Sequence, residues 1–129
     1  MSRKITMEGI VSAFYEKGEY CDYGCNPDEL DTLWEVTIEK TKTSYKNLYA
    51  VKDWIWYDAE KDGEKVKVVK ADYVVRTNNR RFDVGNWVRT SPIIDFTHNC
   101  ICETSSSFYI LVGEGSRKQA DESIFYFFG

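Results

Sequence analysis

Residues 83–115 read DVGNWVRTSPIIDFTHNCICETSSSFYILVGEG, and this stretch contains three short apolar runs separated by turn residues. The runs are Trp87–Phe96, Cys100–Thr104 and Phe108–Val112. Their β-branched and aromatic side chains favour the pleated, half-buried surface of a sheet. The pattern therefore predicts a three-stranded meander at the centre of the fold, with the serines of residues 105–107 forming a hairpin turn.

The apolar residues outside this stretch predict further strands. Their ranges are Ile5–Tyr15, Leu33–Glu39, Leu48–Tyr57, Val66–Thr77 and Ser123–Phe128. Leu33–Glu39 shows the cleanest alternation of apolar and polar residues, whereas Leu48–Tyr57 is also compatible with a short helix. The Asp62-Gly63 pair is typical of the tight turn of a β-hairpin. We expect it to join the strands on either side of it.

A short helix is predicted just before the alternating run at Leu33. Asn26 can cap it and Pro27 suits its first position, while two acidic residues follow in its first turn. Because the alternating run takes over so soon, we expect little more than one helical turn. The polar segment Ser116–Glu122 is expected to form a loop or a single helical turn.

The chain has 129 residues, the size of one ordinary domain, so we expect a single domain that covers residues 1–129. Aromatic residues make up 16% of it, and this favours sheet over helix. The predicted fold is mainly β, or α+β, in the form of a small antiparallel barrel or sandwich of about seven or eight strands. One or two short helical turns complete it.

The charge is distributed unevenly along the chain. The net charge is −4, yet residues 1–40 hold nine acidic residues against four basic ones. An acidic face built by this third of the chain would repel nucleic acids and anionic membranes and attract a basic protein surface. The simpler alternative is an acidic surface that only keeps the protein in solution.

No targeting segment or membrane span is predicted from the sequence. Met1–Lys17 is charged and lacks the apolar core of a secretory signal, and no run approaches the length of a membrane-crossing helix. We therefore expect a cytoplasmic protein. In that compartment the four cysteines are expected to stay reduced.

The central stretch also carries Gly85-Asn86-Trp87-Val88-Arg89-Thr90-Ser91-Pro92, Cys102-Glu103-Thr104, Phe108-Tyr109-Ile110-Leu111-Val112-Gly113 and Gly115-Ser116-Arg117-Lys118. This block resembles the C-terminal part of a family of small, uncharacterised bacterial proteins that also occur on mobile elements. The family pattern is G-x-W-V-R-T-S-P followed by E-T-x-x-S-x-Y-x-L-x-G-x-G-x-R-K. The resemblance covers about a quarter of the chain. It implies a bacterial or phage origin and brings no assigned activity.

The cysteines and the single histidine leave two chemical alternatives open. Cys21-x3-Cys25 and Cys100-x-Cys102, with His98 nearby, have the residue types of a zinc site, but the second spacing fits a zinc knuckle poorly. A catalytic thiol beside His98 would need an orienting carboxylate that the sequence does not specify. No phosphate-binding loop, dinucleotide fingerprint or calcium loop is present. We therefore predict a binding protein rather than an enzyme, without cofactor or metal.

Two binding hypotheses remain. In the leading one, the protein is an acidic inhibitor-type module, such as a toxin immunity protein or a phage or mobile-element inhibitor of a host defence system, and it blocks a basic surface of a protein partner. The predicted partner-binding residues are Glu16, Glu19, Tyr20, Asp22, Tyr23, Asp28, Glu29 and Asp31. In the alternative, a β-barrel binds a nucleotide-like or other phosphorylated ligand by charge contact and stacking. The residues predicted for that site are Arg80, Arg81, Arg89 and Trp87.

Overall fold

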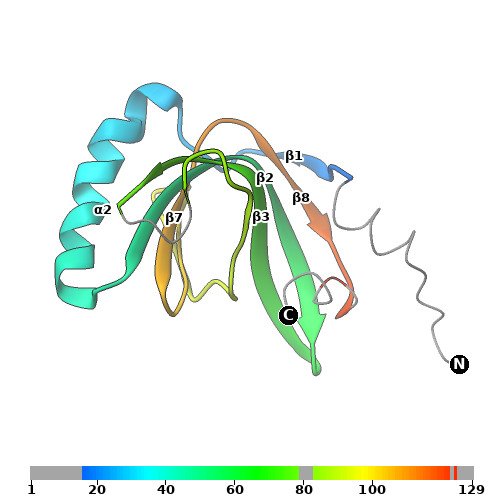
Figure 1. Cartoon of the computed structure of the whole chain (residues 1–129). Helices are drawn as coiled ribbons and strands as arrows, with labels where there is room; N and C mark the ends of the chain where they lie inside the picture. Colours follow the sequence, from blue (N-terminus) through cyan, green and yellow to red (C-terminus); the bar gives the residue numbers. More distant parts are fainter. Residues whose placement is uncertain (1–15, 79–82, 123, 125–129) are drawn as a thin grey trace, which may run out of the picture.

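The computed structural model describes residues 16–78, 83–122 and 124. Within these ranges the fold is mainly β, as the sequence predicts: eight strands form one sheet that curls into half a barrel, and one α-helix packs against it (Figure 1). The strands are β1 (Glu19–Cys21), β2 (Asn47–Lys61), β3 (Glu64–Thr77), β4 (Val88–Arg89), β5 (Asp95–Thr97), β6 (Ile101–Glu103), β7 (Ser107–Leu111) and β8 (Gly115–Gln119). The helical elements are the 3₁₀ turn η1 (Pro27–Glu29) and the helix α2 (Leu30–Ser44). None of the described helices is long and apolar enough to cross a membrane.

Strand β2 lies at the centre of the sheet. Along one side it pairs antiparallel with β3, and along the other it pairs parallel first with β7 and then with β8. The predicted meander is confirmed, because β5, β6 and β7 pair antiparallel in sequence order. Its first run is broken into β4 and β5 around Pro92, which has no N–H to donate to a ladder. The two parallel ladders were not predicted, because alternation along a strand does not show the direction of its neighbour.

Asp53 lets one strand serve both parts of the sheet. Its φ of 55° lies in the left-handed region, which shifts the alternation of β2 by one residue. Tyr49 and Val51 before it, and Trp54 and Trp56 after it, therefore all enter the same apolar cluster. Asp53 stands where β2 leaves β7 and begins to approach β8. The curl of the sheet thus has a defined hinge residue.

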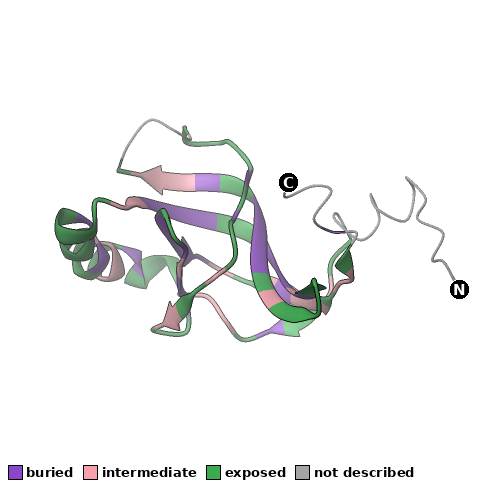
Figure 2. Cartoon of the chain, turned by 90° about the horizontal axis from the view of Figure 1, so that it is seen from below, coloured by how far each residue is buried: buried purple, intermediate pink, exposed green. Residues whose placement is uncertain are grey.

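The two faces of β2 bury different apolar clusters. The concave face holds the two tryptophans together with residues of β3, β6 and β7. On the opposite face, Leu48 and Ala50 pack against Leu30 and its neighbours on α2. Beyond the hinge, Ile55 and Tyr57 join a third cluster that includes Ile124. Figure 2 shows the buried residues following the central strands, with exposed ones on the outer face of α2 and at the hairpin tip.

The prediction of a strand at Leu33–Glu39 is wrong, since these residues belong to α2. Asn26 caps the preceding 3₁₀ turn in a capping box with Glu29, and the helix continues to a left-handed Tyr45. The buried or half-buried face then recurs at helical spacing, at Leu30, Leu33, Trp34, Thr37, Ile38 and Thr41. The predicted helix start at Pro27 is therefore correct, but the predicted helix is too short. The strong cap allows the helix to continue through the alternating segment.

The predicted loop at Ser116–Glu122 is also corrected, because most of it forms β8. Its polar residues adopt a strand because β8 pairs with β1 on one side and with β2 on the other. The buried Ser116 hydroxyl accepts a hydrogen bond from the Gly18 N–H at 3.0 Å. The predicted strand at Ile5–Tyr15, and all of the predicted strand at Ser123–Phe128 except the buried Ile124, lie outside the described residues.

One predicted strand and two predicted turns are confirmed. Leu48–Tyr57 lies wholly within β2, and Asp62 and Gly63, both with positive φ, form the tight turn between β2 and β3. The serines of residues 105–107 lie at the turn from β6 to β7. His98 and Asn99 also have positive φ and are the two central residues of the turn Thr97–Cys100 between β5 and β6, which the Cys100 N–H closes by donating to the Thr97 carbonyl oxygen. This gives the single histidine a conformational role.

The path of the chain around Trp54 predicts a large cost for one small substitution. A methyl group at position 115 would lie 2.2–2.5 Å from the Trp54 ring, so Gly115→Ala should lower the free energy of unfolding by about 3 kcal/mol through overpacking. Gly63→Ala is the control, because Gly63 has φ of 82° and open space around it. That variant should lose only about 1 kcal/mol of stability, because alanine is strained at this positive φ. Urea denaturation measures both, and equal losses would contradict the close contact at Gly115.

Candidate functional site

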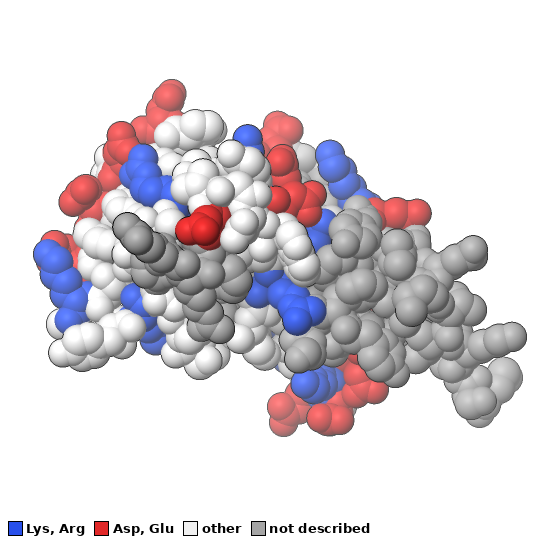
Figure 3. Space-filling view, viewed as in Figure 1, with Lys and Arg blue, Asp and Glu red and all other residues white. Residues whose placement is uncertain are grey.

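The acidic segment Glu16–Asp31 lies along one margin of the sheet. It runs through the edge strand β1, crosses to η1 and ends in the first turn of α2. All its acidic side chains are exposed, and Tyr20 is 78% exposed. In Figure 3 red side chains gather along the upper rim, where β1 and the start of α2 lie, with blue ones between them. The segment is therefore an acidic, accessible surface.

Some of the predicted contact residues also stabilise the fold. The Arg76 Nη2 donates to the Asp31 carboxylate at 2.7 Å, and the Asn26 N–H donates to the Glu29 carboxylate at 3.0 Å. By contrast, Glu19, Asp22 and Asp28 form no ion pair with any described residue. These three acids therefore have the least structural explanation within the segment.

Tyr23 is placed differently from the other predicted contacts. It is only partly buried, yet its ring packs against Trp56 and Phe96 with centroid distances of 5.1 and 4.8 Å. Its hydroxyl oxygen accepts a hydrogen bond from Arg117 at 2.9 Å. Tyr23 therefore anchors the acidic segment to the concave face of the sheet, and Tyr20 is the aromatic residue that it presents to solvent.

The predicted ligand cluster is only partly visible. Arg80 and Arg81 lie outside the described residues. Arg89 is exposed on β4, directly across from Lys70 of β3, and Trp87 just before it is 52% exposed. Neither residue lines the hollow beside β8 or the one beside Tyr20. The predicted ligand cluster therefore stays a prediction.

A different arginine forms an aromatic cluster that the sequence did not reveal. Arg117 of β8 donates through Nε and Nη2 to the two carboxylate oxygens of Asp58 on β2. Trp56 Nε1 donates to the same carboxylate at 3.3 Å. The Arg117 guanidinium lies 5.6 Å from the centroid of the Tyr23 ring and 6.0 Å from that of Trp56. We call this the Arg117 cluster: Arg117, Asp58, Trp56, Tyr23 and Phe96.

The electrostatics of the Arg117 cluster favour the charged form of the guanidinium. Hydrogen bonding to Asp58 raises the pKa of Arg117, so the guanidinium remains a fixed cation. The Asp58 side chain is only 15% exposed, and it accepts three hydrogen bonds. Since Asp58 and Arg117 are 59 residues apart, no local pattern could have paired them. The only sequence signal was the presence of Arg117 in the family-like block.

A hollow of about 650 Å³ opens beside the Arg117 cluster, between β8 and the end of the β2–β3 hairpin. Arg117, Lys65 and Lys67 contribute its positive charges. Its negative charges come from Asp58, Glu60, Asp121 and Glu122. This volume is in the range of small-molecule sites.

A second hollow of about 440 Å³ lies beside Tyr20 at the margin of the sheet. Its charged lining consists of Asp53, Asp72 and Glu114 together with Lys17 and the buried Lys70, whose Nζ lies 2.7 Å from the Asp72 carboxylate. It therefore adds further acidic groups next to the acidic segment.

The four cysteines are free and buried. Cys25 and Cys100 contact each other through their side chains, whereas Cys21 and Cys102 lie in the other large cluster. Burial raises the pKa of the Cys100 thiol to about 12 and also raises that of Cys102, so both stay protonated at neutral pH. Residues 16–78, 83–122 and 124 contain no group of three or more side chains that could hold a metal ion. The buried thiols explain the cysteines without an activated nucleophile.

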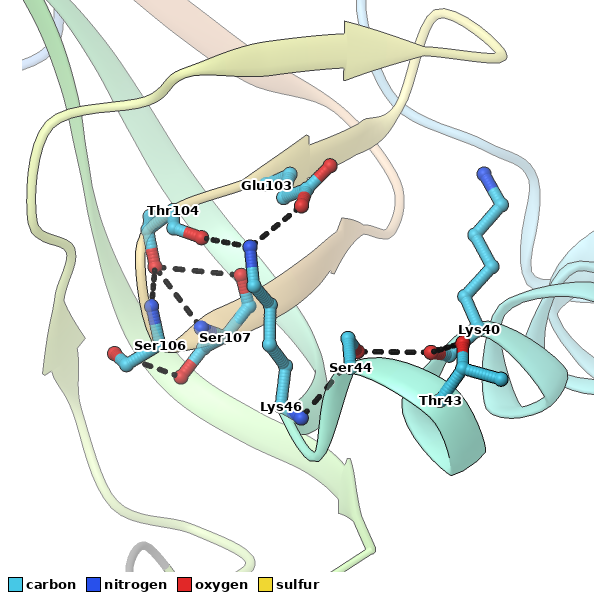
Figure 4. Close-up of polar contacts among 8 residues, drawn as sticks. All are labelled: Lys40, Thr43, Ser44, Lys46, Glu103, Thr104, Ser106 and Ser107. Atoms are coloured by element: carbon cyan, nitrogen blue, oxygen red, sulfur yellow. Dashed lines mark hydrogen bonds and ion pairs between the residues drawn. The ribbon is translucent and has the colours of Figure 1, made fainter.

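The serines after β6 have a structural role (Figure 4). The Thr104 hydroxyl accepts the Ser107 N–H at 3.1 Å, which closes the turn. Lys46, between α2 and β2, reaches over this turn to the Glu103 carboxylate and donates to the Thr104 carbonyl oxygen at 2.8 Å. The cluster ties the end of α2 to the meander rather than forming an open anion site.

Comparison with family models places this architecture in a known group. A model described as a domain of unknown function (DUF6957) matches residues 24–126. The chain belongs to this family. Comparison with curated proteins and with solved structures found no match. The family match covers α2 and the whole sheet except β1, and its description assigns no function.

The Arg117 cluster predicts an unequal effect of two similar substitutions. Asp58→Asn removes a charged acceptor from an ion pair in which the Asp58 side chain is 15% and the Arg117 side chain 39% exposed, so it should lower the free energy of unfolding by about 1 kcal/mol after solvent screening is allowed for. Glu39→Gln is the matched control, because the Glu39–Lys42 pair is about two-thirds exposed on α2 and should contribute less than about 0.5 kcal/mol. Chemical denaturation followed by tryptophan fluorescence measures both. If the two variants lost the same free energy of unfolding, the Asp58–Arg117 pair would be no more stabilising than an exposed ion pair.

The buried thiols predict a loss of stability at alkaline pH. The pKa of Cys100 is about 12 when folded, whereas a free thiol has a pKa of about 8.5. The folded state therefore holds the proton more tightly, so this stabilisation is complete below about pH 8.5 and falls as pH rises above it. Denaturation from pH 7 to 10 should show the decline, and Cys100→Ala should flatten it. A Cys100→Ala slope equal to that of the wild type would contradict the assignment.

Proposed function

We propose that this protein is a small cytoplasmic protein-binding module of the inhibitor type, which covers a basic surface of a partner protein. A toxin immunity protein and a phage or mobile-element inhibitor of a host defence system are the two settings that suit it. The observation that carries the proposal is the acidic segment, whose carboxylates are all exposed and which also carries the exposed Tyr20.

The composition of this surface supports protein binding. Protein interfaces are rich in tyrosine at their centre and have a polar rim, and complementary charge speeds association. Tyr20 is the exposed tyrosine of the acidic segment. Glu19 precedes it on β1, and Asp22 follows β1. The neighbouring hollow adds Asp53 and Glu114, which form no ion pair with a described residue. A basic side chain of a partner would meet several carboxylates here.

The scaffold supports a binding role because it holds the segment rigidly. Arg117 bonds to Tyr23, the Asn99 side-chain amide donates to the Asp22 carbonyl oxygen at 2.9 Å, and the Gly24 N–H donates to the Asn99 carbonyl oxygen at 2.9 Å. These contacts pin the middle of the segment to β8 and to the turn between β5 and β6. A surface ordered before binding loses less entropy when it docks.

The acidic surface predicts a site-specific charge effect. Changing Glu19, Asp22 and Asp28 together to Lys leaves the fold-stabilising Glu29 and Asp31 intact and should weaken partner binding at least about tenfold. The control changes Glu64, Asp83 and Asp95 to Lys, because these acids are exposed elsewhere and their reversal alters the net charge equally. Affinity capture with each variant, quantified by mass spectrometry and followed by titration of the captured protein, measures the effect.

The control should retain the partner and the first variant should lose it, and the wild-type affinity should fall with rising salt. Retention of every captured protein by the first variant would refute the proposed surface. An equal loss in both variants would show that net charge alone, and not this surface, governs binding.

A further inference from the structure

We propose that Cys25 and Cys100 form a redox switch: an oxidant joins them in a disulfide, and this bond locks the acidic segment onto the meander. Both thiols are free and buried in the structure. In the cytoplasm, disulfides are mostly transient and redox-sensing rather than permanent links. The inference concerns the two thiols alone, so it does not depend on the proposed partner surface.

The backbone brings the two cysteines together beside one residue of β7. The Leu111 N–H donates to the Cys100 carbonyl oxygen at 2.8 Å, and the Leu111 carbonyl oxygen accepts the Cys25 N–H at 2.9 Å. Cys25 also forms an isolated parallel bridge with Val112. The acidic segment therefore pairs with β7 just beyond the point where the chain enters β6, and the two cysteines meet at this junction.

The side chains of the two cysteines belong to the same apolar cluster, on the face of the sheet that α2 covers. The two thiols interact there, side chain to side chain. Cys25 is 5% exposed and Cys100 is 1% exposed. Each nevertheless has an exposed neighbour in the chain, Asn26 and Asn99 respectively. The pair therefore lies just beneath the surface.

The other two cysteines are placed differently. Cys21 of β1 lies across from Gly115 of β8, and Cys102 of β6 lies between its partners on β5 and β7. Both belong to the cluster of the concave face, whereas Cys25 and Cys100 belong to that of the opposite face. The structure thus pairs one cysteine from each of the two sequence motifs, rather than the two members of one motif.

The oxidation balances with a hydroperoxide as the oxidant. Cys25 gives up its proton and its sulfur attacks one oxygen of hydrogen peroxide, so that the O–O bond breaks and a sulfenic acid and water form. The Cys100 sulfur then attacks the Cys25 sulfur, the S–O bond breaks, and the leaving hydroxide takes the Cys100 proton as a second water. The two thiols lose two electrons in total, and the peroxide is reduced to water.

The closed segment protects this pair. Burial raises the pKa of both thiols, to about 12 at Cys100, so few thiolates are present at neutral pH. Oxidation therefore requires a local opening that breaks the hydrogen bonds of Cys25 to Leu111 and Gly113. The disulfide then prevents the same opening. The switch thus reacts from the open form and holds the segment in the closed form.

The test treats the whole reduced protein with hydrogen peroxide. Its mass should fall by about 2 Da, because one disulfide replaces two thiols. The thiols that react with N-ethylmaleimide in denaturant should fall from four to two, and a reductant should restore them. Fragmentation of the digested protein by mass spectrometry should link Cys25 to Cys100. A bond in any other pairing, a sulfinic acid without a bond, or four unreacted thiols would each overturn the switch.

Two variants assign the bond. Cys25→Ala should abolish it. Cys21→Ala is the matched control and should retain it, because Cys21 is a buried cysteine of the same segment that lies in the other cluster. Equal loss of the bond in both variants would contradict the pairing. If a variant fails to fold, the fragmentation of the wild-type protein still decides which cysteines are joined.

The lock itself is measured by hydrogen exchange on the wild-type protein. The amide N–H groups of Cys25 and Gly113 should exchange at least about tenfold more slowly in the oxidised form than in the reduced form, because the disulfide removes the local opening. The amide N–H of Lys65, in the β2–β3 hairpin, is the control and should not change. Equal exchange at Cys25 before and after oxidation would refute the lock. Partner binding is measured separately, so either proposal can fail alone.

Discussion

The close contact of Trp54 with the turn between β7 and β8 is the constraint on which the sheet depends. Trp54 Nε1 donates to the Gly113 carbonyl oxygen at 3.2 Å, and its ring fills the space where a side chain at position 115 would lie. The chain can pass this close only because residue 115 is glycine. The left-handed Asp53 just before Trp54 aims the ring into the concave face. Together these residues allow β2 to pair with β7 and then with β8.

The same constraint reaches the acidic segment. A methyl group at Gly24, whose φ is 106°, would lie 2.4 Å from the Gly113 carbonyl oxygen and 3.2 Å from the Trp54 ring. The segment therefore crosses over the β7–β8 turn at its tightest point. From there Cys25 donates its N–H to the Leu111 carbonyl oxygen, and Gly113 donates its N–H back to Cys25. The surface proposed to meet a partner is thus fixed to the centre of the sheet by backbone bonds as well as by the Tyr23 side chain.

Local signals in the sequence predicted what depends on neighbours along the chain. Asp62-Gly63 predicted its hairpin, and Asn26 with Pro27 predicted the start of a helix, since both reflect backbone preferences within four residues. The alternation of Leu33–Glu39 led to a wrong prediction, because a run of only seven residues can fit the period of a strand and also that of a helix whose buried face is wide. Strand β8 was missed for the opposite reason: Arg117 and Lys118 are polar, and only pairing with β1 and β2 makes them strand residues.

The candidate sites divide in the same way. Exposed acids in a turn-rich segment could be predicted from composition, because charged side chains in such segments seldom become buried. The role of Tyr23 could not, since its partners Trp56, Phe96 and Arg117 come from three other strands. This residue belongs to both parts of the molecule: its backbone lies in the acidic segment, and its hydroxyl orients the arginine at the hollow. The Arg117 cluster therefore fixes the acidic segment and shapes the hollow through one set of hydrogen bonds.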